Sequence, residues 1–522
     1  VVEAFPQTNY VVHNAGMEFI WMYIRYGISI LNMDDTLLMY HMIDPRKNVL
    51  KNLKTLAKKY LNIHDWDKPV ENYINGRMDR CPKDVISTYV TYDVETCFEL
   101  FSIFKQELID NGCWDAYVNI VKPAIPVVHK MTSHGVRIDA DYLAGVEEEY
   151  TKEANRLHSE LIELSQVKHN PNSNLQIQKI IYDKFKCPNR NNSTGIEELH
   201  FIQEQMKDNT PEYIYKLVEY RDAKKFLSTY ITGLLDKCHP DGRLRSPYKL
   251  EGTETGRLSG SLMTIPSRKG DIIKCAFLPD QDFPYFGSFD YKGLELKVGA
   301  HLSQDKNLIR RVNSEDMHKE MAALIFNIPL EEVTKDQRFV AKTGVFAVMY
   351  FATIGGLVFN LKKDFPAINF ELAEKMITFM RNEFPDLYEY SLKLQKLVVG
   401  EYEGGKCIVP GKHYTETLFG RKRYFPLITP ATYKDVMKQA TNTPIQGTAT
   451  DICLLAGIRI SKEIGWDKFR QQLIIHDSIG GSLLSLEVGE QVKAIMEDVP
   501  FDIDVNFEVE SSKGMPQLAQ LP

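Results

Sequence analysis

The sequence predicts a multidomain protein of the α+β class. A chain of 522 residues is too long for a single hydrophobic core and implies two or more domains. Apolar segments typical of strands lie in the second half of the chain, and long stretches with apolar residues at helical spacing separate them. A hydrophobic content of 43% and a charged content of 25% are ordinary for a globular enzyme.

Composition argues against several classes of protein. No apolar run approaches the ~18 residues that a membrane helix needs, and Val1–Phe5 lacks the basic and apolar regions of a signal peptide. The eight cysteines are scattered without a Cys-x-x-Cys pair, which argues against a zinc site and a disulfide framework. We therefore expect a cytoplasmic protein that does not enter a membrane. Because no initiator methionine is present, we also expect the N-terminus to be cropped or processed.

The net charge of −7 argues weakly against nucleic acid as a partner. Net charge says little, however, when a basic cleft lies on an acidic exterior. The local basic run Gly420–Tyr424 is therefore more informative, although a solvated basic loop is the alternative interpretation.

The N-terminal part, residues 1 to about 115, is predicted to be an α/β unit. It begins with a strand at Tyr10–Val12, a helix that continues through Arg25, and a second helix from Asp35 toward His41. The prolines of Lys122–Pro126 predict a boundary, because prolines this close rarely lie inside a helix. An extended helical arm is expected next, at 141–165, 175–185 and 211–235.

Two aspartates lie at the ends of apolar strands. Phe286–Asp290 is predicted to be a strand that delivers Asp290 to its C-terminal end, and Leu473–Asp477 a strand that turns at Asp477. If these strands lie side by side, the two carboxylates could share a pair of magnesium ions and support transfer of a nucleotidyl group. For either aspartate alone, capping of the local backbone is the commoner explanation.

A cationic helix is predicted between these strands. Thr334 and Gln337 form a capping-box signal for its start. Side chains that recur every four residues then share one face: Arg338, Lys342, Phe346 and Tyr350. The cations could bind β- and γ-phosphates, and the aromatic rings could stack on sugar and base. The alternative is an amphipathic helix with a partly buried aromatic stripe.

These three segments together resemble motifs A, B and C of the family A DNA polymerases, at Phe289–Leu296, Arg338–Tyr350 and Ile474–Ser478. Further blocks are similar to those of the family: Thr253–Ser259, Glu315–His318, Thr417–Tyr424 and Asn442–Gly447. In the N-terminal part, His13–Glu18 and Tyr89–Asp93 resemble the second and third motifs of the family's 3′–5′ exonuclease domain.

The resemblance implies an exonuclease-like α/β domain followed by a right-hand polymerase with a helical thumb, an antiparallel-sheet palm and helical fingers. The expected domains are an N-terminally incomplete exonuclease-like domain at 1–115, thumb and connecting helices at 116–248, palm at 249–312, fingers at 313–440 and palm again at 441–522.

The resemblance also implies roles for individual residues. Those expected in catalysis are Asp290, Asp477 and Lys342, and two Mg²⁺ ions, for which Mn²⁺ can substitute, would be held by Asp290, Asp477 and the backbone of Tyr291. Those expected to bind the deoxynucleoside triphosphate are Arg338, Lys342, Phe346, Tyr350, His318 and Glu295, with Glu295 excluding the ribose 2′-hydroxyl. Those expected to bind DNA are Arg257, Lys438, Asn442, Gln446, His476 and Arg421. Those expected in the exonuclease are Glu18, Tyr89 and Asp93.

The chain departs from the family pattern at several positions. The first exonuclease motif, Asp-x-Glu, is absent, and Glu18 stands where the second usually has aspartate, so we expect impaired proofreading. In the polymerase motifs, residues other than the usual ones are Val345, Ala347, Phe351, Ser478 and Lys297. Loss of motif B glycines would stiffen the helix, and Ser478 removes a carboxylate. The drifted motifs and compact size suggest a bacteriophage enzyme.

Several functions compete at this point. The first is a template-directed DNA polymerase whose partners are primer–template DNA, deoxynucleoside triphosphates and, as a further candidate, a processivity factor. A single-subunit RNA polymerase shares the His-Asp-Ser of motif C, but Glu295 and the Thr253–Ser259 block argue against it. A nuclease with a non-catalytic polymerase half would not need both Asp290 and Asp477. A non-catalytic nucleic-acid scaffold would not need Arg338 and Lys342 at helical spacing.

Overall fold

The computed structural model describes residues 8–74, 77–206, 209–265, 270–350, 352–362, 365, 367–403, 406–425, 428–499, 501 and 503–511. The chain forms two compact units. Unit 1 combines the described parts of 1–135, 246–264 and 279–522, and unit 2 combines those of 136–245 and 265–278. Among the described residues, none of the helices combines the length and apolar character that crossing a bilayer requires.

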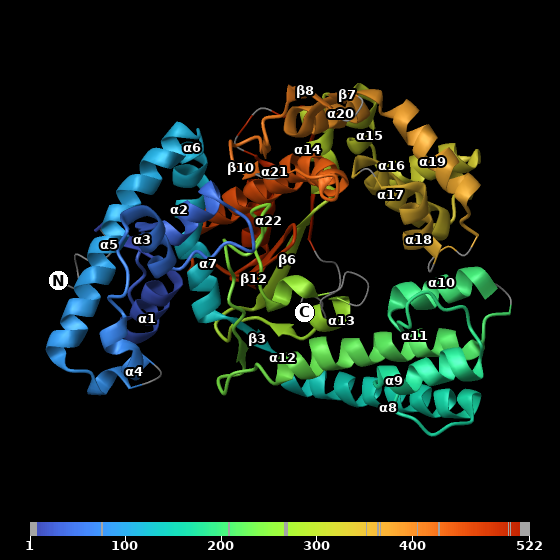
Figure 1. Ribbon diagram of the computed structural model, residues 1–522, viewed down its shortest axis with the longest axis horizontal. Coiled ribbons are helices and arrows are strands. Elements are labelled where there is room, and N and C mark those ends of the chain that lie inside the picture. Colours follow the sequence, from blue (N-terminus) through green and yellow to red (C-terminus); the bar gives the residue numbers. More distant parts are fainter. Residues whose placement is uncertain are drawn as a thin grey trace. The chain divides into compact units, whose positions relative to one another are not determined.

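Unit 1 opens with the predicted α/β region. Strands β1 (Tyr10–Val12) and β2 (Met33–Asp35) pair in parallel, and helices pack around them: α1 (Gly16–Tyr26), α2 (Thr36–Ile43), α3 (Leu53–Leu61), α4 (Glu71–Ile74) and α5 (Lys83–Asp110) (Figure 1). The strand and both helices predicted from the sequence are confirmed. Asp35 fixes the geometry, because its buried carboxylate accepts hydrogen bonds from the amides of Asn14, Ala15 and Leu37 at 2.8–3.0 Å. It thereby caps α2 and holds the start of α1 beside it.

The boundary predicted at Lys122–Pro126 is wrong. Both prolines lie in α7 (Lys122–His134), which continues directly from α6 (Trp114–Ala116) and a π-helical turn, Tyr117–Val121. Pro123 closely follows the π-helical turn, whose wider hydrogen-bonding pattern accommodates the missing donor. The wider π-helical turn precedes Pro126 and supplies the local adjustment that lets the helix pass through a residue without a donor. The change of unit comes after α7, at Gly135.

Unit 2 is mostly helical. A small antiparallel sheet places β3 (Val136–Ile138) between β4 (Arg243–Leu244) and β5 (Phe277–Leu278). The long helix α8 (Ala140–Ser165) packs along α11 (Glu212–Lys225), as Figure 1 shows. The remaining helices are α9 (Asn174–Gln178), α10 (Ile196–Met206), α12 (Gly233–Leu235) and α13 (Gly270–Lys274), with π-helical turns at Lys179–Lys184 and Phe226–Thr232. The helices expected at 141–165, 175–185 and 211–235 are all present.

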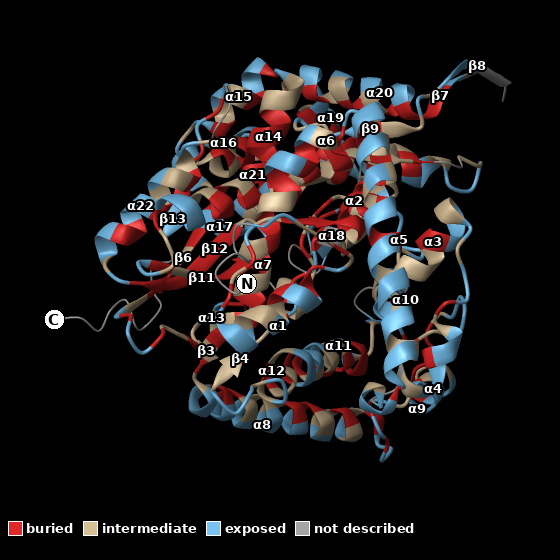
Figure 2. Ribbon diagram, turned by 90° about the vertical axis from the view of Figure 1, so that its left-hand side faces the viewer, coloured by how far each residue is buried: buried red, intermediate tan, exposed pale blue. Residues whose placement is uncertain are grey.

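A four-stranded antiparallel sheet forms the centre of unit 1, in the order β11-β12-β6-β13. Its strands are β6 (Tyr285–Tyr291), β11 (Phe469–Ile475), β12 (Ser478–Leu483) and β13 (Val509–Ser511). The two strands predicted to carry aspartates are therefore confirmed. Helices α21 (Tyr433–Glu463) and α22 (Leu486–Glu497) pack against the sheet, and α21 is buried along much of its length (Figure 2).

The segment between these strands is rich in helices, as predicted. In chain order they are α14 (Leu294–Ser303), α15 (Lys306–Val312), α16 (Met317–Phe326), α17 (Lys335–Met349), α18 (Ile354–Lys362), α19 (Phe370–Glu383) and α20 (Pro385–Val399). Two short hairpins that the sequence pattern did not predict follow α20: β7 (Gly400–Glu403) with β8 (Lys406–Pro410), and β9 (Tyr414–Glu416) with β10 (Lys422–Tyr424).

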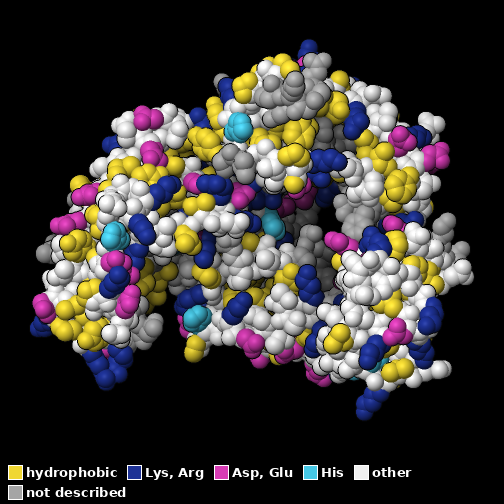
Figure 3. Space-filling view, in the orientation of Figure 1, with side chains coloured by type: hydrophobic (Ala, Val, Ile, Leu, Met, Phe, Trp, Pro, Cys, Tyr) yellow, Lys and Arg dark blue, Asp and Glu magenta, His cyan; other side chains and the backbone are white. Residues whose placement is uncertain are grey.

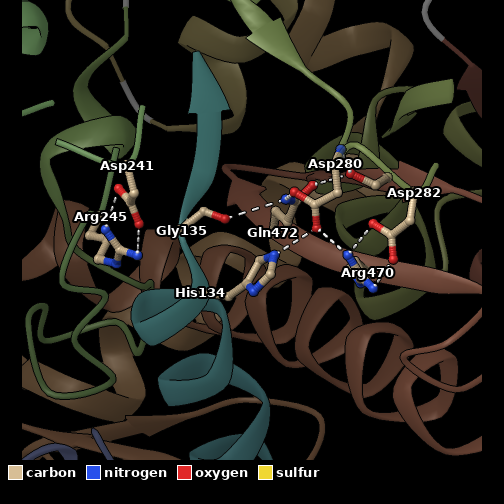
Figure 4. Close-up of polar contacts among 9 residues, drawn as sticks. His134, Gly135, Asp241, Arg245, Asp280, Asp282, Arg470 and Gln472 are labelled. Carbon is tan, nitrogen blue, oxygen red and sulfur yellow. Dashed lines mark hydrogen bonds and ion pairs between the residues drawn. The ribbon is translucent and has the colours of Figure 1, made fainter. Parts of the chain in front are cut away.

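A buried polar cluster lies at the end of α7 (Figure 4). The carboxylate of Asp280, which is 1% exposed, accepts hydrogen bonds from His134 Nε2 at 2.7 Å, Arg470 Nη1 at 2.8 Å and Gln472 Nε2 at 3.1 Å. Arg470 also pairs with the exposed Asp282, at 2.5 Å. The cluster thus joins the last turn of α7 to the segment before β6 and to β11. Removing a buried acceptor of this kind leaves several donors unsatisfied.

Replacing Asp280 with alanine is expected to lower the free energy of unfolding of unit 1 by about 3 kcal/mol, because His134, Arg470 and Gln472 lose their shared acceptor. Asp282→Ala is the matched control and should cost less than about 1 kcal/mol, since Asp282 is exposed. Urea unfolding followed by tryptophan fluorescence measures both, because all four tryptophans lie in unit 1. Equal losses for the two variants would contradict this account of the cluster.

Candidate active site

The two predicted metal-binding aspartates lie at one end of the central sheet. Ser478 of β12 is directly opposite Asp290 of β6, and Asp477 precedes it in the two-residue turn that joins β11 to β12. The backbone amide of Tyr291 donates to the carbonyl of Asp477 at 3.3 Å. His476 is the other turn residue and has the left-handed φ of +53° that such a tight turn requires. The strand pairing therefore brings Asp290 and Asp477 to neighbouring positions, as the sequence predicted.

The electrostatics agree with this juxtaposition. Burial raises the pKa of the Cys453 thiol, and the charges of Asp477 and Asp290 raise it further, so both carboxylates lie near this cysteine of α21. Burial also raises the pKa of Asp477, and the nearby Arg257 opposes that shift. Burial makes the charged form of Asp477 unfavourable, and a divalent cation would offset this by supplying positive charge directly at the carboxylates.

Ser478 does not supply a third metal ligand of the carboxylate type. Its hydroxyl donates to the carbonyl of Ile475 at 3.0 Å and closes the β11–β12 turn. In the described part of the chain no group of three or more histidine, cysteine, aspartate or glutamate residues could hold a metal. Two carboxylates nevertheless fit magnesium, which takes few protein ligands and keeps positions for water and phosphate.

A hydrogen-bonded cluster lies beside the carboxylates. Glu295, at the start of α14 and only 9% exposed, accepts hydrogen bonds from Arg257 Nη2 and from the hydroxyl of Tyr350. Burial raises the pKa of the Tyr350 hydroxyl, and a hydrogen bond with the side chain of Gln446 partly opposes that shift. Four residues that were predicted separately, for sugar, base and DNA contacts, thus meet at one place.

Helix α17 has the predicted start. The hydroxyl of Thr334 accepts from the amide of Gln337 at 3.2 Å, and the Gln337 side chain accepts from the amide of Thr334 at 2.9 Å, which confirms the capping box. Lys342 and Arg338 are exposed on this helix. Arg338 is paired with Asp316, with Nε 2.8 Å from Oδ2. An ion pair this exposed contributes little stability, so a phosphate could displace Asp316.

His318 lies beside the same helix face. Its ring centroid is 6.5 Å from that of Phe346, which is in turn 6.4 Å from that of Tyr350. Burial, with a further contribution from Lys342 and Arg338, lowers the pKa of His318 to about 4. Its Nδ1 is buried and finds no hydrogen-bond partner among the described residues. His318 is therefore a neutral imidazole with an unsatisfied nitrogen next to two cations.

The residues expected to bind DNA divide into two groups. Lys438, Asn442 and Gln446 recur every four residues on α21, with Lys438 exposed, and His476 is exposed in the β11–β12 turn. Asn442 Oδ1 is buried and has no partner in the described part of the chain.

Arg421 differs from this expectation. It is buried, and its Nη2 lies 2.6 Å from Oδ1 of Asp451, which is fully buried on α21. A guanidinium in that environment is held by its partner and is not presented to DNA.

The basic run at Gly420–Tyr424 is neither a DNA-binding patch nor a solvated loop. Besides the Arg421 pair, Lys422 Nζ donates to the carbonyl of Asn111 at 2.6 Å, and Arg423 pairs with Glu254. Basic and acidic side chains are interspersed over the face drawn in Figure 3. The basic side chains of this run therefore form contacts within the protein, which hold the N-terminal region and the Thr253–Ser259 block against β10.

Sequence reasoning missed the acidic partners in this network. Asp451, Glu254 and Asp316 each hold an arginine, and none was predicted to do so. Asp451 did have a signal, because it is the one charged residue between Lys438 and Arg459 on α21, and a charge in such an apolar stretch needs a partner. The substitution at Phe351 lies outside the described residues, and Val345 is buried on α17.

The expected exonuclease residues come from two helices. Glu18 lies on α1, and Tyr89 and Asp93 lie one turn apart on α5. Asp93 accepts a hydrogen bond from Trp66 Nε1 at 2.8 Å. Burial and the adjacent Asp93 raise the pKa of Tyr89 to about 12. Burial raises the pKa of the Cys97 thiol, and the charges of Glu18 and Asp93 raise it further, so both carboxylates lie near this cysteine.

Comparison with known proteins gives consistent results. A family model described as DNA polymerase family A matches residues 140–517. The thermostable DNA polymerase I of Thermus aquaticus is 32% identical over 415 residues, which are 76% of this chain and 48% of that protein. DNA polymerase I of Bacillus subtilis is 29% identical over 498 residues, 92% of this chain and 54% of that protein. The chain thus spans about half the length of these relatives.

A solved structure has the same fold. It is described as the POL domain of Pol1 from M. smegmatis in complex with DNA primer–template and dNTP. The TM-score is 0.82, over 98% of this chain and 86% of that one, at 23% sequence identity. The likeness covers both the central sheet and the helical regions, since nearly the whole chain is matched.

The raised pKa of Asp477 predicts a stability cost in the absence of metal. The folded chain binds the Asp477 proton more tightly than the unfolded chain, so stability is lost as pH rises from the ordinary carboxyl pKa through the raised one. We expect Asp477→Asn to melt at a higher temperature than the unchanged chain in EDTA at about pH 7.5, and the gain to shrink at about pH 4.5. Asp504→Asn is the control with the opposite sign, since hydrogen bonding from Gln304 lowers the pKa of Asp504. A lower melting temperature for Asp477→Asn at the higher pH would refute the prediction.

Proposed function

Because this chain belongs to DNA polymerase family A, we propose that it extends a primer 3′ end with deoxynucleotides in a template-directed reaction. The observation that supports this most is the register that brings Asp290 and Asp477 together, with Arg257, Glu295 and Tyr350 joined beside them. These residues would serve primer–template DNA and a deoxynucleoside triphosphate. An RNA polymerase receives no support from the relatives, which are DNA polymerases.

The carboxylates of Asp290 and Asp477, with the backbone carbonyl of Tyr291, would hold two Mg²⁺ ions. When bound, the ions would lower the pKa of the primer hydroxyl and stabilise the leaving pyrophosphate. The chain itself supplies orientation, because the pairing of β6 with β12 fixes both carboxylates at one end of the sheet. Positioning of this kind accounts for most of the catalysis of phosphoryl and nucleotidyl transfer.

The triphosphate would bind along α17. Arg338 would exchange its exposed pair with Asp316 for charge-assisted hydrogen bonds to phosphate oxygens, which are stronger. Lys342 lies one turn further on and would serve as the cation and proton donor nearest the reacting phosphate. The neutral His318 would donate to phosphate through Nδ1, which finds no hydrogen-bond partner among the described residues. Phe346 and Tyr350 would then lie beside the sugar and the base.

Several finer features belong to the same proposal. They are the expected division of the polymerase part into thumb, palm and fingers, the use of two metal ions, the DNA contacts of Lys438, Asn442, Gln446 and His476, a processivity factor, and a cytoplasmic location in the host of a bacteriophage. The 3′–5′ exonuclease is not included, because Glu18, Tyr89 and Asp93 supply two carboxylates and Glu18 stands in for the aspartate of the motif.

Primer extension tests the proposal. With Mg²⁺ and deoxynucleotides we expect the chain to extend a primed template, and Asp290→Ala and Asp477→Ala each to slow extension more than about 100-fold, because each removes a metal ligand. EDTA should stop the reaction and added Mg²⁺ should restore it. Asp282→Ala, which changes an exposed aspartate outside the site, is the control. Extension mainly with ribonucleotides, or shortening of the primer alone, would overturn the assignment.

Glu295 is expected to determine sugar selectivity. Its carboxylate is held by Arg257 and Tyr350, and under this proposal the fixed side chain would exclude a ribose 2′-hydroxyl. Glu295→Ala should raise ribonucleotide incorporation relative to deoxynucleotide incorporation by at least about tenfold, since a site that relies on exclusion loses its bulk. Glu295→Gln keeps the bulk, can accept from Arg257 through its amide oxygen and donate to the Tyr350 hydroxyl through its amide nitrogen, and should retain the selectivity. Single-nucleotide kcat/KM values for a matched pair of triphosphates give the ratio, and an unchanged ratio in Glu295→Ala would disprove the role.

A further inference from the structure

The turn that carries Arg257 is closed by the carbonyl of Thr253. This oxygen accepts from the amide of Gly256 at 3.3 Å, and the Thr253 hydroxyl donates to the carbonyl of Arg257 at 2.8 Å. Gly256 has a φ of +83°, and a Cβ there would lie 2.9 Å from Nε of Arg421. The direction in which Arg257 leaves the turn, and hence its contact with Glu295, depends on this closure.

His41 reaches the same carbonyl from the N-terminal region. It lies in the last turn of α2, is 4% exposed, and has Nε2 at 3.0 Å from the oxygen of Thr253. Its other nitrogen, Nδ1, is 2.9 Å from Nζ of Lys51, which also donates to the carbonyl of Arg46. A lysine ammonium can only donate, so Nδ1 is the acceptor and the ring proton is on Nε2. His41 is therefore a donor of fixed tautomer aimed at Thr253.

The charge state of His41 is fixed as well. Burial, with the positive charges of Lys51 and Arg421, lowers its pKa to about 3. Asp44 and the carbonyl of Thr253 oppose this shift only in part. The ring stays neutral at any pH near 7, and the hydrogen bond to Thr253 does not titrate there.

Two further contacts hold the loop in the same place. The amide of Lys47 donates to Oε1 of Glu254 at 3.1 Å, and Arg423 pairs with the other carboxylate oxygen of Glu254. Arg423 is itself anchored by Gln439 at 2.7 Å and by Thr443 at 3.1 Å on α21. The loop is thus held by hydrogen bonds from His41 of α2 and Lys47 after it, and by the ion pair with Arg423 of β10.

We propose that His41 is a positioning residue for nucleotidyl transfer, acting through Thr253 on the placement of Arg257. The inference rests on the proposed function, and it gives the N-terminal α/β region a part in the polymerase reaction whether or not that region cuts DNA. Arg257 touches Glu295, so a misplaced turn changes both the hold on the primer end and the shape of the sugar site. A histidine that served only to fill the core would affect neither property beyond its effect on stability.

Variants of His41 separate these two roles. His41→Leu fills a similar volume but has no donor, so the buried carbonyl of Thr253 loses one hydrogen bond and the turn is expected to shift. We expect kcat/KM for primer–template to fall about tenfold and the discrimination against ribonucleotides to weaken. His41→Gln retains an amide donor and should recover most of both properties. Melting temperatures of the two variants should be similar. His129→Ala, which removes a half-buried ring beside Phe19 in the same unit, is the control for lost packing.

The outcomes are distinct. Extension and sugar selectivity of His41→Leu equal to those of the unchanged chain would overturn the inference. So would equal losses in His41→Leu and His41→Gln that follow their melting temperatures, or the same loss of selectivity in His129→Ala. If the unchanged chain itself does not extend the primer, the proposed function fails and the role of His41 fails with it. Recovery by glutamine but not by leucine supports the positioning role.

Discussion

The pairing of β6 with β12 is the constraint on which the site depends. With Ser478 opposite Asp290, the carboxylate of Asp290 and the turn that carries Asp477 share one end of the sheet. A slip of one residue would turn Asp290 to the other face. The far end of the pair is fixed by Ser482, whose hydroxyl accepts from the amide of Asp280 at 2.9 Å and donates to Gln472 at 2.8 Å. The close pairing of β11 with β12 also requires glycine at position 481, because a Cβ there would lie 2.0 Å from the carbonyl oxygen of Arg470.

The basic residues discussed above fall into two groups according to whether they are paired inside the protein or exposed. Arg421, Lys422 and Arg423 are held by the protein itself and fix the arrangement of a loop and two helices. Buried pairs of this kind add little net stability, but breaking one leaves an uncompensated charge, so they specify geometry. Arg338, Lys342 and Lys438 are exposed and able to meet phosphate. Local sequence does not separate the two groups, since both consist of basic residues near aromatic ones.

Much of the fold and of the site could be predicted from the sequence. Periodicity gave α8 and the helices of unit 2, and the capping box located the start of α17, because these signals are local. The meeting of Asp290 with Asp477 was predictable only through the joint pattern of motifs, and the contact of Glu295 with Tyr350 was not predicted. Burial of Arg421 and passage of α7 through Pro126 were not, because each depends on a tertiary partner or an adjacent π-helical turn. Exposure is a property of the folded chain, and charge alone does not reveal it.

The N-terminal region is tied to the polymerase centre by the rule that buried polar groups need partners. The carbonyl of Thr253 is satisfied by a histidine 212 positions earlier in the chain, and the carboxylate of Glu254 by a backbone amide 207 positions earlier. Lys422 closes the same contact from the other side, through a carbonyl at the end of α5. Each bond is modest alone, but together they hold the turn whose arginine contacts Glu295. Whether or not the N-terminal region cuts DNA, its backbone and its buried histidine therefore complete the hydrogen bonding of the loop beside Asp477.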